Sequence, residues 1–484
     1  MSIGYLRSYA TYLPQHRLDR QEIGSTLNSS PGRGQRVVAS FDEDSTTMAV
    51  AACRTTLAPL ADDDLTGQAY DIYFATTSPA YLDKTNASAV HAALGLNGHG
   101  LAADLAGSAR SGIAALRAAA ASGGIAVAAD VRVGLPGSGD ERSGADGAAA
   151  FVFAAPGDTT EQDAAIAEVL AAVSSTAEVL DRWRSPARQN AEIWEERFGS
   201  DEYAPIVRET AERALEAAGL VEADHVVLVS PNAGLVKKAT TLAKGAISTS
   251  DSPVGHAGAA DLGIALAAVL DVAEPGQSIL ALLAADGCDA IVLRTTGHLP
   301  ACRQACSIAE QIAAGTPVPY ATYLTWRGLL TREPPRRPEP DRPGAPPSSR
   351  GSRWKFGFTG SRCLACGFAQ LPPARICRKC SAVDEMAAER FADATGTVAT
   401  YTVDRLAFSP SPPLVDAVVD FAGGGRFTLE IADADPDALA VGQSVSLVFR
   451  RLFTAGGVHN YFWKAKVNLS PLPGSGTTDA GKRS

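Results

Sequence analysis

The sequence lacks any apolar run of the ~18 residues that a membrane-spanning helix needs. Residues 1–18, MSIGYLRSYATYLPQHRL, also lack the apolar centre of a secretory signal peptide. An excess of positive charge is missing as well, because 43 lysines and arginines stand against 53 aspartates and glutamates. The resulting net charge of −10 argues against nucleic acid as a main partner. We therefore expect a cytoplasmic protein with no membrane span and no nucleic-acid partner.

Cysteine is scarce, with eight residues in 484, and half of the cysteines fall into two Cys-x-x-Cys pairs. In a reducing compartment such pairs predict two knuckles that hold one tetrahedral ion through four thiolates, and zinc suits this ligand set. No open coordination position is visible, so we predict a structural Zn²⁺. The predicted ligands are Cys363, Cys366, Cys377 and Cys380. The other cysteines are spaced singly and are expected to be ordinary buried side chains.

Residues 1–330 alternate continuous apolar strands with helical patterns. This order predicts an α/β fold with a mostly parallel sheet that is covered on both faces. The sequence ADGAAAFVF at residues 145–153 returns as ADGCDAIVL at residues 285–293. This repeated sequence indicates a duplication, so we expect two similar halves, residues 1–165 and 166–330, with a site between them.

The composition changes after residue 330. Residues 331–353 are rich in proline and arginine, which predicts an extended, exposed linker. Residues 354–385 contain the paired cysteines and are expected to form a zinc ribbon. Five short strand patterns in residues 386–467 predict an OB-fold β-barrel. Residues 468–484 are polar and are expected to be a disordered tail.

The first half is organised around Ala102–Gly124, AADLAGSARSGIAALRAAAASGG. The pattern predicts a strand end, a tight turn at Gly107 and a helix of small residues with Ser108 as its N-cap. Such an elbow places one side chain at a helix N-terminus, where free N–H groups favour a thiolate or an oxyanion. Because the elbow holds no cysteine, Ser108 is a candidate donor or weak nucleophile, and a helix cap is the structural alternative.

Further candidates lie in loops beside predicted strand ends, where α/β proteins place functional groups. His256 follows a glycine at a turn-to-helix junction and can supply a proton or a hydrogen bond near neutral pH. Tyr81 can act at a β-hydroxyl with Asp83 as its partner. Arg110 and Lys84 can hold a phosphate or a carboxylate of a bound cofactor. A histidine bonded to the backbone, loop packing and solvated surface charge are the respective alternatives.

Five separated motifs in this chain resemble motifs of the thiolase superfamily and occur in the same order. They are IGYLRSYATYLPQHRL at 3–18, TTSPAYLDKT at 76–85, AADLAGSARSG at 102–112, VVLVSPN at 226–232 and VGHAGAADLGIALAAVLDVAEPGQSIL at 254–280. Residues 1–300 resemble the branch that contains 3-hydroxy-3-methylglutaryl-CoA synthase and ketoacyl-ACP synthase III. Residues 354–467 resemble the zinc-ribbon/OB-fold domain found beside thiolase-like enzymes, including archaeal HMG-CoA synthase assemblies and steroid side-chain aldolases.

The resemblance implies a thiolase-like duplicated αβαβα layered domain, followed by a rubredoxin-like zinc ribbon and an OB-fold β-barrel. It also implies a coenzyme A thioester as substrate and a role in lipid metabolism. A homodimer that pairs through sheet edges is a further expectation, as is a separate thiolase or hydratase partner protein. Fold alone does not give the reaction, so the site residues decide the function.

At four positions the sequence departs from the family. The nucleophilic cysteine of the synthases matches Ala109, and the family histidine matches Val229. The general-base glutamate of the HMG-CoA synthases matches Thr77, and the asparagine of the ketoacyl synthases matches His256. Alanine, valine and threonine cannot carry an acyl group through a thiolate mechanism.

Three functions follow from these departures. The first is a lyase or aldolase reaction without a covalent intermediate, chiefly retro-aldol cleavage of a 3-hydroxyacyl-CoA. The second is acyl transfer or condensation like that of HMG-CoA synthase or a ketoacyl synthase, with a substitute nucleophile. The third is a non-catalytic acyl-CoA-binding scaffold. Among these the sequence favours the first.

Overall fold

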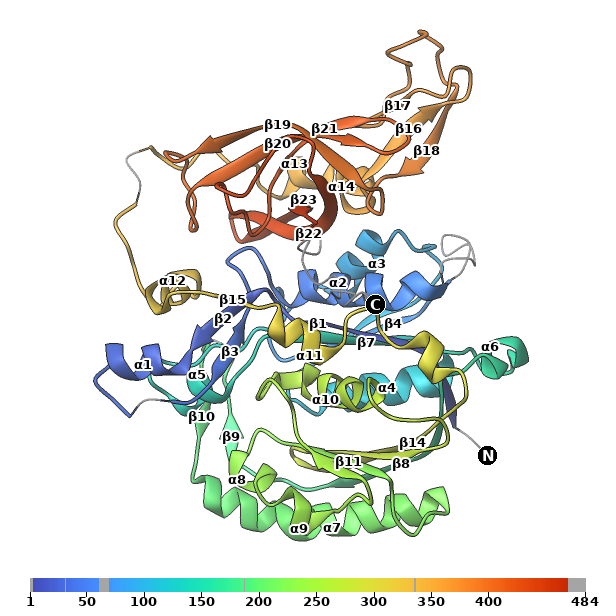
Figure 1. Ribbon diagram of the computed structural model, residues 1–484, viewed down its shortest axis with the longest axis vertical. Coiled ribbons are helices and arrows are strands. Elements are labelled where there is room, and N and C mark those ends of the chain that lie inside the picture. Colours follow the sequence, from blue (N-terminus) through green and yellow to red (C-terminus); the bar gives the residue numbers. More distant parts are fainter. Residues whose placement is uncertain (1–2, 31, 61–68, 187, 335–336, 469–484) are drawn as a thin grey trace, which may run out of the picture. The chain divides into compact units, whose positions relative to one another are not determined.

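The computed structural model describes residues 3–30, 32–60, 69–186, 188–334 and 337–468 (Figure 1). The chain divides into two compact units. The first comprises Met1–Gly357 with Phe449–Phe462, and the second comprises Phe358–Val448 with Trp463–Ser484. No helix in the described residues is both long and apolar enough to cross a bilayer.

The first unit is built on a ten-stranded sheet with the order β12-β11-β13-β14-β8-β1-β7-β6-β4-β5. The strand order is β1-β7-β6-β4-β5 in the first half and β8-β14-β13-β11-β12 in the second. In both halves the strands, numbered along the chain, therefore lie in the same order, and the two halves are joined where β1 pairs with β8. The duplication predicted from the repeated sequence is thus visible as repeated topology. The bounds are β1 Gly4–Tyr12, β4 Ile72–Thr76, β5 Ala102–Ala106, β6 Gly124–Asp130, β7 Gly147–Phe153, β8 Ala167–Thr176, β11 His225–Val229, β12 Ser248–Ser250, β13 Ser278–Ala284 and β14 Gly287–Thr295.

The sheet is mixed, which corrects the prediction of a mostly parallel sheet. Strand β4 runs parallel to β5 and β6, and β11 runs parallel to β12 and β13. The pairs β6–β7 and β13–β14 are antiparallel, as are the pairs that join the halves. Both kinds of strand are buried on two faces here, so their apolar runs look alike in sequence.

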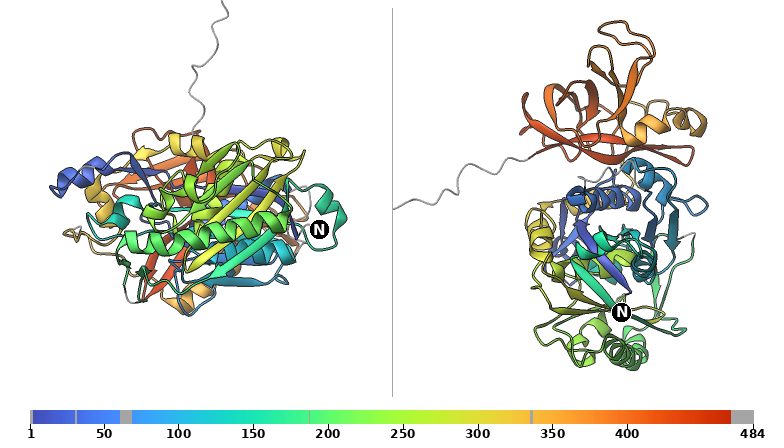
Figure 2. Two further views of the ribbon diagram at one scale, coloured as in Figure 1. Left: turned by 90° about the horizontal axis from the view of Figure 1, so that it is seen from below. Right: turned by 90° about the vertical axis from the view of Figure 1, so that its right-hand side faces the viewer.

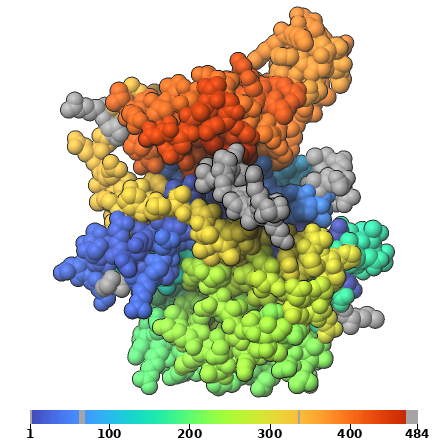
Figure 3. Space-filling view, viewed as in Figure 1, coloured from blue at the N-terminus to red at the C-terminus, as the bar shows by residue number. Residues whose placement is uncertain are grey.

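Helices cover the sheet in three layers (Figure 1). Helices α4 (Ser111–Ser122) and α10 (Asp261–Leu270) contact each other between the strands of the two halves. Helix α2 (Ser45–Leu57) packs on β1 and β7, and α7 (Glu196–Ala218) packs along β8 and β14, as Figure 2 also shows. This is the expected αβαβα layering. The green and yellow surface in Figure 3 belongs to the second half of this unit.

Several helices differ from their predicted bounds. Helix α4 begins at Ser111 with Arg110 as its N-cap, so Ser108 is not the cap. Residues 233–242 form two single helical turns, α8 Ala233–Val236 and α9 Ala239–Leu242. The predicted linker is helical near its end, where α13 (Ala345–Ser349) begins with prolines and α14 (Ser352–Gly357) follows. Proline fits the first helical turn because that turn does not need its N–H groups.

The remaining elements of the first unit are short. A three-stranded sheet has the order β15-β2-β3, and β9 pairs with β10. Their bounds, with the other helices, are α1 Arg20–Thr26, β2 His16–Asp19, β3 Gln35–Val38, α3 Ala87–Leu94, α5 Gly139–Ser143, α6 Thr159–Asp163, β9 Arg182–Trp183, β10 Glu192–Ile193, α11 Ile308–Ala313, β15 Thr316–Pro317 and α12 Tyr320–Trp326.

The second unit contains two sheets. One joins β16 (Thr359–Cys363), β17 (Ala369–Gln370) and β18 (Met386–Arg390). The other has the order β21-β20-β19-β22-β23, and a bridge between Ile431 and Ala465 links its two ends, as in an OB barrel. Its strands are β19 Gly396–Asp404, β20 Leu414–Phe421, β21 Arg426–Glu430, β22 Ser444–Ala455 and β23 Val458–Val467, and the parts of β22 and β23 within Phe449–Phe462 are counted in the first unit. The predicted tail lies outside the described residues from position 469 onward.

One buried carboxylate fastens several loops of the first unit together. Strand β6 ends at Asp130, which is fully buried. Its oxygens accept hydrogen bonds from the backbone and hydroxyls of residues 76–78 at 2.7–2.9 Å. They also accept the N–H of Ala259 at 2.6 Å. Gly258 has φ +61°, and a Cβ there would lie 2.0 Å from the Asp130 carboxylate. Asp130 therefore ties the end of β4 to the turn before α10.

Replacing Asp130 by alanine should destabilise the first unit strongly, because several buried donors lose their acceptor at once. We expect the free energy of unfolding to fall by about 3 kcal/mol or more. Urea unfolding followed by circular dichroism measures this change. The matched control is Asp163→Asn, since Asp163 is exposed, and it should change the free energy by less than about 0.5 kcal/mol. Equal stability of Asp130→Ala and the wild type would contradict the assigned role.

Candidate functional site

A cavity of about 190 Å³ lies at the elbow, entirely within the first unit. The elbow contributes Ser108 and Ala109 to its wall, and the turn before α10 contributes His256. Thr77 and Arg132 come from the loops that follow β4 and β6. The rest of the wall includes Asp181, Arg182, Trp183, Arg184, Tyr203, Ser230 and Asp286. The wall therefore draws on both halves of the duplicated fold, as expected for a site between them.

The elbow presents backbone donors. Gly107 has φ +127°, a conformation that favours glycine, and it turns the chain from β5 into the start of α4. The Ser108 hydroxyl accepts the Arg110 N–H at 3.3 Å, and the Ser108 carbonyl accepts the Ser111 N–H at 3.1 Å. Within the described residues the amide N–H groups of Ser108 and Ala109 meet no acceptor. Two free N–H groups at the positive end of a helix suit a developing oxyanion.

His256 lies beside a buried carboxylate. Its Nδ1 lies 3.0 Å from Asp261 Oδ2, and its side chain is 11% exposed. Burial lowers the pKa of His256; the Asp261 carboxylate opposes this shift, while Arg132 and Arg182 add to it. The neutral ring then donates Nδ1–H to Asp261, which leaves Nε2 as an acceptor. A histidine oriented in this way can take a proton from a bound hydroxyl.

Two of the predicted residues are therefore brought together in the cavity, Ser108 and His256, and four are not. Tyr81 is half-buried and its hydroxyl accepts the N–H of His459 at 2.7 Å. Asp83 and Lys84 are exposed, and the Lys84 ammonium donates to the Thr85 carbonyl at 3.1 Å. None of these three lines the cavity.

Arg110, the fourth, is occupied within the protein. Its Nε donates to Asp289 Oδ2 at 2.6 Å, and its other nitrogens donate to the Asp286 carbonyl and the Thr176 hydroxyl. The bond to Asp289 raises the pKa of Arg110, with a smaller opposing effect of burial. Arg110 thus fastens the elbow to β8 and β14, and its guanidinium is committed to this role.

The cavity wall contains functional groups that the sequence analysis missed, above all Arg132, Asp181 and Arg182. Arg182 forms a bidentate pair with Asp140, both bonds measuring 2.7 Å. Asp181 lies 3.4 Å from the Tyr203 hydroxyl, and burial raises its pKa. These residues belong to loops and a two-residue strand, where no periodic pattern marks them. Their side-chain partners, Thr77, Tyr203 and Asp140, are at least 20 positions away in sequence, so no local signal could have identified them.

Among the residues that the structure describes, no cysteine lines the cavity wall. Ala109 lines the wall at the elbow, and Val229 lines a neighbouring cavity that also touches His256. Cys53 and Cys288 are buried elsewhere; burial raises the pKa of both thiols, that of Cys288 to about 12. A thiol with a raised pKa is a poor nucleophile near neutral pH.

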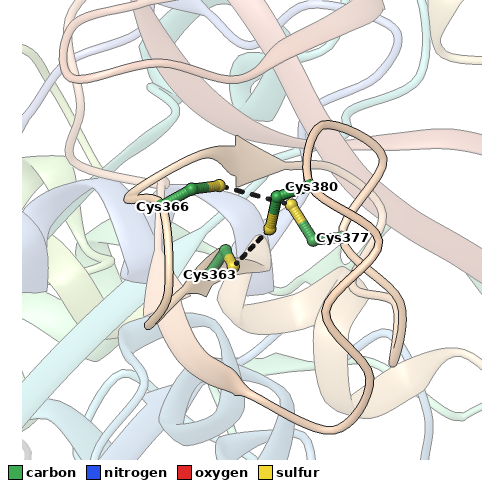
Figure 4. Close-up of side chains that lie close together, drawn as sticks. All are labelled: Cys363, Cys366, Cys377 and Cys380. Carbon is green, nitrogen blue, oxygen red and sulfur yellow. Dashed lines mark hydrogen bonds between the residues drawn. The ribbon is translucent and has the colours of Figure 1, made fainter.

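The four paired cysteines of the second unit form a cluster (Figure 4). Their sulfur atoms all lie within 4.8 Å of one another. The Sγ atoms of Cys363 and Cys380 are 3.6 Å apart, as are those of Cys366 and Cys377. A tetrahedron of thiolates at ~2.3 Å from a zinc ion has edges of ~3.8 Å, so this set fits a metal ion with four sulfur ligands.

Comparison with known proteins agrees with both units. Residues 357–386 match the family described as ChsH2, rubredoxin-like zinc ribbon domain, and residues 389–450 match ChsH2, C-terminal OB-fold domain. A DUF35 domain-containing scaffold protein of Methanothermobacter thermautotrophicus is 33% identical over 117 residues, which are 23% of this chain and 87% of that protein. The chain belongs to the DUF35 domain family.

The thiolase-like part has relatives of its own. The hydroxymethylglutaryl-CoA synthase of Methanosphaera stadtmanae is 28% identical over 350 residues, 66% of this chain and 97% of that protein. That of Archaeoglobus fulgidus is 27% identical over 348 residues, again 66% and 97%. The structure of MvaS in complex with 3-hydroxy-3-methylglutaryl coenzyme A has a TM-score of 0.57 at 18% identity and covers 70% of this chain and 95% of that chain. The resemblance stated from the sequence motifs is confirmed, and the solved structure confirms the thiolase-like fold.

The buried histidine predicts a pH dependence of stability. Because folding lowers the pKa of His256, the folded state binds fewer protons at this site than the unfolded state does. The contribution of His256 to the free energy of unfolding is complete above a pH of about 6.5, the pKa of histidine in the unfolded chain. This contribution is lost as the pH falls below that value. Urea unfolding at pH 7.5 and pH 5.5 should show a smaller loss of stability on acidification in His256→Gln than in the wild type. Parallel pH profiles of the two proteins would contradict this.

Proposed function

We propose that this protein binds acyl-CoA thioesters in the elbow cavity and makes or breaks a carbon–carbon bond of a 3-hydroxyacyl-CoA without forming an acyl-enzyme. The observation that carries the proposal is that an alanine at the elbow and a His256 ring held by the Asp261 carboxylate line one cavity. The similarity to hydroxymethylglutaryl-CoA synthases supports a coenzyme A thioester as substrate.

In the cleavage direction, His256 Nε2 takes the proton of the 3-hydroxyl group. The oxygen lone pair forms a carbonyl, the bond between C2 and C3 breaks, and its electrons pass to the thioester as an enolate. The Ser108 and Ala109 N–H groups stabilise the enolate oxygen, and the Ser108 hydroxyl adds a third donor. The protonated His256 then returns its proton to C2 of the enolate, which gives a shortened acyl-CoA beside the aldehyde or ketone. Asp261 holds the ring and stabilises its protonated form.

Turnover of a panel of 3-hydroxyacyl-CoA esters, followed by chromatography of the CoA products, tests this function. We expect His256→Gln to lower kcat by about 100-fold or more, because a general base contributes about 10²–10⁴. Ser108→Ala should cause a smaller loss. The matched control is His99→Gln, since His99 is exposed and lies outside the cavity wall, and it should keep full activity. Full activity of His256→Gln, or no turnover by the wild type, would contradict the proposal.

Two alternatives rest on the relatives. The similarity to hydroxymethylglutaryl-CoA synthases favours acyl transfer with a substitute nucleophile. Ser108 is the candidate for this nucleophile, because its hydroxyl group belongs to the elbow turn and Ser108 lines the cavity. The scaffold relative favours a non-catalytic role, in which the chain binds acyl-CoA without turnover. The same panel separates them, because a transferase needs a second acyl acceptor and a scaffold turns over none of the esters.

We also propose that the sulfur cluster holds a structural Zn²⁺, that the chain is cytoplasmic, and that it forms a homodimer through β5. Strand β5 is the last strand of the ten-stranded sheet, so its outer edge meets no other strand among the described residues. An unpaired edge of this kind can add a strand from a second copy. A separate thiolase or hydratase partner remains part of the proposal.

Elemental analysis of the purified full chain should find one zinc per chain. Cys363→Ser should abolish stoichiometric zinc and lower the Tm of the second unit, because metal binding contributes directly to folding in small zinc domains. Cys306→Ser is the control, since this cysteine is exposed and lies in the first unit, and it should keep the metal. A wild-type chain that folds fully and contains no metal would contradict the assignment.

A further inference from the structure

The first unit contains a segment from the C-terminal part of the chain. This segment is Phe449–Phe462, the turn end of the hairpin that β22 and β23 form. It brings two consecutive arginines, Arg450 and Arg451, to the acidic turn that precedes α2. The turn consists of residues 42–44, Asp-Glu-Asp, and all three of these acids are buried. The function proposed above uses none of these groups.

Charge and hydrogen bonds fix the hairpin on the acidic turn. Arg450 donates to the buried Glu43 carboxylate. Tyr461 donates to Asp44 Oδ2 at 2.8 Å, and the backbone N–H of Arg451 donates to a carbonyl of the turn at 2.9 Å. Buried carboxylates that lose their cation are costly, so the hairpin and the turn stabilise each other.

The hairpin reaches the loop between β4 and α3 by two routes. The backbone N–H of His459 donates to the Tyr81 hydroxyl at 2.7 Å, and the centroids of the two rings are 5.1 Å apart. The second route passes through α2, whose N-cap Asp44 is held by the hairpin. Next to this cap, the Ser45 hydroxyl donates to the Ser78 carbonyl at 2.8 Å. Tyr81, a catalytic candidate from the sequence, thus joins the loop to the hairpin.

The same loop forms part of the wall of the elbow cavity. Thr77 lines the cavity, and its hydroxyl accepts a hydrogen bond from Arg132 Nη1 at 2.8 Å. The Ser78 hydroxyl accepts the backbone N–H of Val131 at 3.0 Å. A displacement of residues 77–81 would therefore disturb the chain after β6, which carries Arg132 into the cavity wall.

Two further anchors hold the ends of this loop. Asp130 accepts the backbone N–H groups of Thr77 and Ser78, and Asn86 exchanges two hydrogen bonds with the backbone of Tyr81. The hairpin adds a contact at the Tyr81 side chain, between these anchors. Loss of this contact should consequently loosen the loop without unfolding the unit.

We propose that the hairpin at Phe449–Phe462 positions the wall of the elbow cavity, with Tyr81 and Tyr461 as the positioning residues. The hairpin holds the loop of residues 77–81, and the loop in turn holds Arg132. The cavity therefore depends on the C-terminal part of the chain, although no hairpin residue lines the wall in the described parts of the structure. The proposal goes beyond the proposed function, because it concerns the shape of the cavity and not the reaction.

Hydrogen–deuterium exchange of the full chain, followed by mass spectrometry of its peptides, tests the proposal without a ligand. Tyr81→Phe removes the acceptor of the hairpin N–H, and Tyr461→Phe removes the donor to the N-cap of α2. In both variants we expect the amides of residues 77–86 and 131–133 to exchange at least about fivefold faster, as the loss of one hydrogen bond predicts. The amides of β11, in the other half of the unit, should exchange as in the wild type.

Binding of acetyl-CoA, measured by calorimetry, adds a readout that a purely structural role would leave unchanged. Acetyl-CoA carries no 3-hydroxyl group, so the proposed reaction does not interfere. Both variants should bind it about fivefold more weakly. The control variant is Tyr5→Phe, because the Tyr5 hydroxyl meets no partner among the described residues, and it should keep both the exchange rates and the affinity.

Unchanged exchange of residues 131–133 in both variants would overturn the proposal. Faster exchange with an unchanged affinity for acetyl-CoA would also overturn it, because the loop would then move without affecting the cavity. Faster exchange of residues 131–133 in a chain whose wild type does not bind acetyl-CoA would support the positioning role and contradict the proposed function.

Discussion

The hydrogen bonds that converge on the Asp130 carboxylate hold the cavity together. They fix the end of β4, where Thr77 stands, and the turn before α10, where His256 stands. A buried charge with so many donors is costly to disturb, because each donor would lose its partner in a medium that offers no water. The same residue explains Gly258, since any side chain there would collide with the carboxylate. The geometry of the site thus depends on a residue that does not line the cavity wall.

The duplication of the fold provides the second constraint. Helices α4 and α10 are buried side by side, so their N-terminal turns meet, and each brings a different kind of group. The turn before α4 offers N–H groups that meet no acceptor among the described residues, and the turn before α10 offers a histidine whose Nδ1 lies beside Asp261. An acid–base group opposite an oxyanion site is sufficient for aldol chemistry on a thioester, and a thiol is not required.

The resemblance to the thiolase superfamily implied the layered fold, the repeated sequence predicted the two halves, and the Cys-x-x-Cys spacing predicted the cysteine cluster. The sequence did not predict the mixed sheet, since buried parallel and antiparallel strands have the same apolar pattern. The sequence did not identify Arg132, Arg182 and Arg184 as residues of the cavity wall, because their positions depend on contacts between distant loops. Tyr81 and Lys84 can donate a proton or bind an anion and follow a strand end, as predicted. Their polar atoms instead contact His459 and Thr85.

The central claim is that the acyl group reacts while bound and is never attached to the protein. Intact-mass spectrometry after incubation with an excess of acyl-CoA, followed by rapid acid quenching, tests it most directly. We expect the mass of the chain to stay unchanged at every time point, since no thiol among the described residues lines the cavity. A stoichiometric mass increase equal to the acyl group, located by proteolysis to the elbow peptide, would contradict it.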